Sequence, residues 1–87
     1  MPKPPYCALL AYADLGGARI ERIFIKETRE QAVRFRRMGR DAVRPLELPE
    51  DELLILLGDA VAAGVFSKGF LADLLAVLDA QTRARYA

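Results

Sequence analysis

The sequence predicts a small α+β domain, in which an antiparallel sheet is followed by a C-terminal helical hairpin packed against it. Three observations predict this class. Strand-like runs fill the first third of the chain, capped helical segments fill the second half, and 87 residues leave room for one core. The predicted order is ββαβαα. We expect one domain over residues 1–87, with residues 1–5 disordered.

Two strands joined by a tight turn are predicted near the N-terminus. Residues 6–13 are apolar throughout, which is typical of a buried strand. The following Asp-Leu-Gly-Gly at 14–17 is a turn signal, because glycine tolerates the positive φ angles of a hairpin turn. Residues 19–26 alternate in part and are rich in β-branched side chains, which favours a strand. A helix also fits part of this segment, through Ile20, Ile23 and Phe24.

A basic helix is predicted next, over residues 29–39. Thr28-Arg29-Glu30-Gln31 matches a capping box, in which the threonine and glutamine side chains satisfy each other's backbone amides. Its apolar stripe is thin and consists of Ala32, Phe35 and Met38. Residues 43–48 are predicted as a third strand. Pro45 cannot donate a hydrogen bond to a neighbouring strand, so it belongs at an edge or a bulge.

Two further helices complete the prediction. The first runs from Pro49 to about residue 63, has three acids in its first turn and ends at Gly64. Ser67 caps the second, which runs over about 68–83.

Both of these helices are apolar on more than one side. Their apolar surface is larger than a small sheet can cover. We therefore predict a homodimer through the small face of the last helix, formed by Ala72, Ala76, Val77 and Ala80. The alternative is that core packing accounts for these apolar residues.

The charges are sorted along the chain. Residues 19–44 hold nine arginines and lysines against four acids, whereas residues 45–81 hold seven acids against one lysine. The net charge of +1 therefore combines a stretch of +5 with one of −6. The candidate partner-binding residues are Arg29, Arg34, Arg36, Arg37, Arg40 and Arg44.

Three interpretations of this arginine cluster remain open. In the first, the arginines engage a protein partner that has an acidic surface. In the second, the partner is a nucleic acid, since the planar guanidinium donates two parallel hydrogen bonds to a phosphate. In the third, the arginines form a solvated face, since the helical pairs Glu30–Arg34 and Arg37–Asp41 would occupy some of them.

The composition argues against an enzyme. The chain has no histidine, so Ser67 lacks a general base and Cys7 cannot complete a zinc site. We expect no metal and no cofactor. Uninterrupted apolar runs such as residues 53–57 are far too short to cross a bilayer, and no signal peptide is visible. The sequence therefore predicts a cytoplasmic, non-enzymatic adaptor, inhibitor or regulator that acts through protein–protein contacts, a type common in bacteria and phages.

Overall fold

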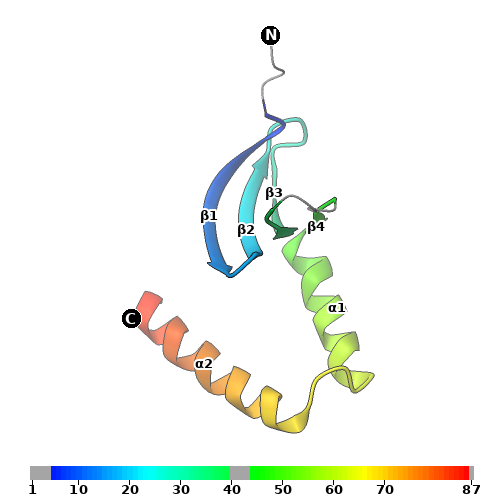
Figure 1. Cartoon of the computed structure of the whole chain (residues 1–87), viewed down its shortest axis with the longest axis vertical. Coiled ribbons are helices and arrows are strands. Elements are labelled where there is room, and N and C mark those ends of the chain that lie inside the picture. Colours follow the sequence, from blue (N-terminus) through cyan, green and yellow to red (C-terminus); the bar gives the residue numbers. More distant parts are fainter. Residues whose placement is uncertain (1–4, 40–43, 87) are drawn as a thin grey trace. The chain divides into compact units, whose positions relative to one another are not determined.

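The computed structural model describes residues 5–39 and 44–86, and it confirms the α+β class. Four strands precede two helices (Figure 1). The elements are β1 (Cys7–Leu15), β2 (Ala18–Ile25), β3 (Glu30–Arg37), β4 (Leu46–Leu48), α1 (Glu50–Ala62) and α2 (Lys68–Tyr86).

The strands form one antiparallel sheet in the order β1-β2-β3-β4. The predicted hairpin turn at Gly16-Gly17 is confirmed, and Gly16 has the positive φ, 60°, that such a turn requires. The register of β1 against β2 shifts between Leu9 and Ala11, so Leu10 is the extra residue of a bulge. β1 and β4 are the edge strands of the sheet.

The predicted basic helix over 29–39 is wrong, because residues 30–37 form β3. The apparent capping box spans the turn between β2 and β3 and the first two residues of β3. In the turn, Arg29 has φ 59° and its amide donates to the carbonyl of Ile25. β3 then pairs with β2 along its whole length, from Ile25↔Glu30 to Ala18↔Arg37. A short isolated helix is marginal in water, so this long-range pairing outweighs the local helix signal.

The third predicted strand is observed as β4, which is shorter than predicted. Pro45 immediately precedes this edge strand, in agreement with its inability to donate. Residue 43 lies outside the described residues.

Both C-terminal helices are observed. The carbonyl of Pro49 accepts the first helical bond of α1, from Leu53, and Gly64 follows the helix with φ 76°. Ser67 caps α2, as predicted: its hydroxyl accepts a hydrogen bond from the amide of Phe70 at 3.1 Å.

Replacing Ser67 by alanine should fray the start of α2. Loss of an N-cap hydroxyl costs about 1 kcal/mol, which corresponds to roughly fivefold less protection of the Phe70 amide against hydrogen exchange. Ser67→Asp keeps a capping oxygen and is the control. Equal protection in Ser67→Ala and the unmodified protein would contradict the capping role.

The chain divides into two compact units, Met1–Ile55 and Leu56–Ala87. Within the first unit, the buried hydrophobic residues among those described are Ile23 and Ala32, which are neighbours across β2 and β3. The predicted packing of the helices on the sheet, and the single domain, stay predictions.

Candidate functional site

The cross-strand register divides the sheet into two different faces. Partners directly opposite each other share a face, and successive residues alternate between faces. Two neighbouring rows cross all four strands. The first row, which we call the charged row, is Tyr12, Glu21, Arg34 and Glu47. The second, which we call the apolar row, is Ala13, Ile20, Phe35 and Leu46, and it lies on the opposite face.

The charged row takes part in a chain of hydrogen bonds that begins at Glu21, whose side chain is fully buried. The Arg34 Nε donates to Glu21 Oε1 at 2.6 Å, and its Nη1 donates to the Tyr6 hydroxyl at 2.9 Å. Tyr6 in turn donates to Glu47 Oε1 at 2.9 Å. The network therefore joins β2, β3 and β4 to the residue that precedes β1.

Two more arginines approach the same carboxylate. Arg19 Nη1 lies 3.3 Å from Glu21 Oε2, and Arg36 Nη1 lies 3.8 Å from the same atom. The Arg19 guanidinium also covers the Tyr12 ring, 3.8 Å from its centroid. Arg19 and Arg36 are thus partly neutralised by an acid of their own sheet.

The protonation of the network follows from these contacts. Burial lowers the pKa of Arg34, but its hydrogen bonds to Glu21 and Tyr6 outweigh burial, so the pKa is raised overall and the guanidinium stays charged. Burial and the hydrogen bond to Glu47 raise the pKa of Tyr6 above its ordinary value, so the phenol stays protonated and donates. The charged row is therefore a stabilising network.

The apolar row lies in an open depression of about 820 Å³ at the end of the sheet that carries the β1–β2 turn. Ile20, Phe35 and Leu46 from this row are all exposed in part. Leu15 and Ala18 extend the apolar floor. Large exposed apolar side chains that gather in one depression are typical of a docking surface.

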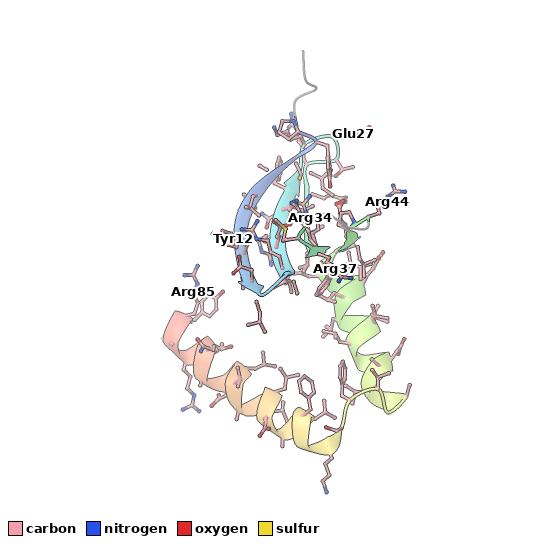
Figure 2. All side chains as sticks on the ribbon, viewed as in Figure 1. Tyr12, Glu27, Arg34, Arg37, Arg44 and Arg85 are labelled. Atoms are coloured by element: carbon pink, nitrogen blue, oxygen red, sulfur yellow. The ribbon has the colours of Figure 1, made fainter. Side chains whose placement is uncertain are left out.

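Arginines border this floor. Arg37 pairs with Ala18 and so lies on the apolar face, and Arg44 lines the depression from the segment before β4. Figure 2 shows Arg44 extending outward from that segment, whereas Arg34 lies at the middle of the sheet. Among the described residues, neither Arg37 nor Arg44 forms an ion pair. The apolar floor is therefore bordered by Arg37 and Arg44, and Asp14 also belongs to the lining.

The six predicted arginines are therefore not lined up along one helix, as the sequence prediction had it. Arg34 and Arg36 lie on the charged face, Arg37 lies on the apolar face, and Arg29 lies in the turn before β3. Arg40 lies outside the described residues. Of these six arginines, Arg37 and Arg44 line the depression beside the apolar row, and Arg36 also contributes to its lining although its guanidinium approaches Glu21.

Sequence reasoning missed the role of Glu21. Its signal is its position: in β2 it is in phase with Ile23 and Ile25, on the side that an alternating pattern assigns to the core. A carboxylate in that phase needs a buried cation, and Arg34 lies directly opposite it.

The predicted dimer residues Ala72, Ala76, Val77 and Ala80 all lie in α2 and are exposed. In the part of the chain that the structure describes, no three histidine, cysteine or acidic residues gather closely enough to bind a metal ion. The described helices are also too short or too polar to span a membrane.

No protein-family model, no curated protein and no solved structure matches this chain.

Proposed function

We propose that this protein is a non-enzymatic protein-binding module, and that the depression on the apolar face receives an acidic, amphipathic segment of a partner protein. The observation that carries the proposal is the apolar row, exposed on the sheet and bordered by Arg37 and Arg44. The partner class is the one predicted from the charge pattern, but the arginines act from β3 and the segment before β4.

The two kinds of side chain would contribute differently. Burying the exposed parts of Ile20, Phe35 and Leu46 supplies affinity, because full burial of such a side chain contributes about 1.5–3 kcal/mol. Arg37 and Arg44 would select carboxylates, since a guanidinium pairs with them through two parallel hydrogen bonds. Charges at the border of an interface mainly set partner choice and association rate.

Nucleic-acid binding is the weaker candidate. A phosphate backbone needs several free cations along one surface, yet Arg19, Arg34 and Arg36 approach Glu21. The apolar floor offers no hydrogen-bond donor to a phosphate.

The contacts around Glu21 also disfavour catalysis. The chain has no histidine, and its buried carboxylate, Glu21, is closed off from any substrate by the arginines around it. An adaptor, inhibitor or regulator needs only the docking surface.

A peptide-binding experiment tests the proposal. A short amphipathic peptide of leucine and glutamate should bind, whereas its leucine–lysine counterpart should not. The double variant Arg37→Glu with Arg44→Glu should weaken binding of the acidic peptide about tenfold or more, since it places like charges at the border. The matched control, Lys26→Glu with Lys68→Glu, changes the net charge equally, and neither lysine lines the depression.

Two results would overturn the proposed function. Equal binding of the acidic and basic peptides would show that the arginines do not select carboxylates. Salt-sensitive binding of duplex DNA or RNA, lost in Arg37→Glu with Arg44→Glu and without any binding of the acidic peptide, would establish the nucleic-acid alternative.

Dimerisation through α2 and a cytoplasmic location remain predictions. The small face formed by Ala72, Ala76 and Ala80 would let a second helix approach closely.

A further inference from the structure

The two edges of the sheet are very different. β4 has three residues, whereas β1 has nine and pairs, among the described residues, with β2 alone. A long edge strand presents a row of backbone amides and carbonyls that another strand can pair with.

β1 also lacks most of the features that protect an edge. Between Cys7 and Leu15 it has no proline and no basic residue, and its one charge is Asp14 near the end. Leu9, Leu10 and Tyr12 are about half exposed. The bulge at Leu10 is the one protective device present, and it sits at the middle of the strand.

We propose that β1 pairs with β1 of a second copy, antiparallel and across a two-fold axis that passes between Leu10 and Ala11. The end of β1 shares Ala13, Asp14 and Leu15 with the lining of the depression, but pairing through the backbone of β1 uses neither Arg37 nor Arg44. The inference therefore does not depend on the proposed function.

The bulge selects this register. Leu9 and Tyr12 face Ile23 and Glu21 of β2, which are two residues apart, so both side chains lie on the same face of the sheet. A two-fold axis between Leu10 and Ala11 then places Leu9 of one copy opposite Tyr12 of the other, twice. Pairs of an aromatic and an aliphatic side chain stabilise neighbouring strands.

The charge of Asp14 favours the antiparallel pairing of the two copies over a parallel pairing. The two Asp14 residues would lie at opposite ends of the paired strands, about 23 Å apart at ~3.3 Å per residue. That separation exceeds the Debye length of about 8 Å at physiological salt, so their repulsion is screened. A parallel arrangement would place them side by side.

The expected dimer is weak. Edge pairing over about 30 Å of strand and a sheet thickness of about 10 Å covers roughly 300 Å² on each copy. A standard stable interface covers about 800 Å² on each partner, so we expect a dissociation constant on the order of 0.1 mM. Light scattering across a concentration series should show the mass rising from 9.7 kDa towards twice that value.

Cysteine cross-linking tests the register directly. In the proposed dimer Cys7 lies opposite Asp14 of the second copy, at a separation of about 4.5–5.5 Å between Cα atoms, which a disulfide can bridge. Asp14→Cys should therefore form a covalent dimer under mild oxidation. The unmodified protein should not, because its two Cys7 residues lie far apart. Leu15→Cys is the matched control: its thiol is exposed but out of register.

A charge pair gives an independent test. Leu9→Lys should leave the protein monomeric, and adding Tyr12→Glu should restore the dimer by placing opposite charges across the two-fold axis. The inference is overturned if the mass stays at 9.7 kDa up to about 1 mM, ten times the expected dissociation constant. It is also overturned if Leu15→Cys cross-links as readily as Asp14→Cys, or if Ala76→Glu in α2 alone abolishes the dimer.

Discussion

Replacing Glu21 by glutamine should destabilise the sheet by about 3–5 kcal/mol, the usual effect of removing one partner of a buried ion pair. The Glu21 side chain is fully buried, and Arg34 beside it is nearly so. Glutamine fills the same volume but leaves the Arg34 charge uncompensated among β2, β3 and β4. The loss should exceed that of any single contact, since Arg19 and Arg36 also approach the same carboxylate.

Hydrogen exchange of the β2 and β3 amides is the appropriate measurement. The chain divides into two compact units, so a single unfolding transition would mix the sheet with the C-terminal helices. The exchange of the α2 amides serves as an internal reference, which should be unaffected.

A second variant separates the charge from the packing. Glu21→Leu with Arg34→Met replaces the pair by apolar side chains of similar size, and should recover most of the lost stability, as buried ion pairs elsewhere allow. If this double variant is as unstable as Glu21→Gln, the ion pair is not the cause. Full stability of Glu21→Gln would contradict the prediction outright.

The elements that the sequence predicts correctly are those with local signals. Ser67 and Gly64 act within one helical turn of the residues that they cap, and Gly16 acts within its own turn. These interactions depend only on neighbours in the chain, so their residue types are sufficient to predict them.

β3 shows where local signals fail. Thr28-Arg29-Glu30-Gln31 has the residue types of a capping box, but its neighbours in space belong to β2. Whether the segment becomes helix or strand depends on pairing between residues as far apart as Ala18 and Arg37, which no local pattern reports.

The same limit applies to the candidate site. The charge pattern predicts that the arginines bind a partner, which stays a prediction; the structure shows that Arg37 and Arg44 line the depression. The charge pattern cannot predict that Arg34 is buried, because that depends on the register that places Glu21 opposite it. A shift of one residue in the pairing of β2 with β3 would move Arg34 to the other face of the sheet. The β2–β3 turn, where Arg29 has a positive φ, sets this register.

Two isoleucines of β2 test which face of the sheet stabilises the fold and which face binds a partner. Ile23 is fully buried between Leu9 and Ala32, whereas Ile20, three residues earlier and on the opposite face, is 42% exposed in the depression. Ile23→Ala should cost about 2–5 kcal/mol of sheet stability, because it removes apolar contacts and leaves a cavity. Hydrogen exchange of the β2 amides measures this loss.

Ile20→Ala should have the opposite effect: it should weaken peptide binding and leave the stability of the sheet almost unchanged. Truncating a half-exposed side chain should change sheet stability by less than about 1 kcal/mol, since little buried area is lost. The same change should weaken binding of the leucine–glutamate peptide about tenfold, because a side chain at the centre of a docking surface contributes most when it is covered. If Ile20→Ala instead unfolds the sheet and Ile23→Ala does not, the stabilising face and the docking face are exchanged. In that case the apolar row is the core of the protein, and the depression is not where a partner binds.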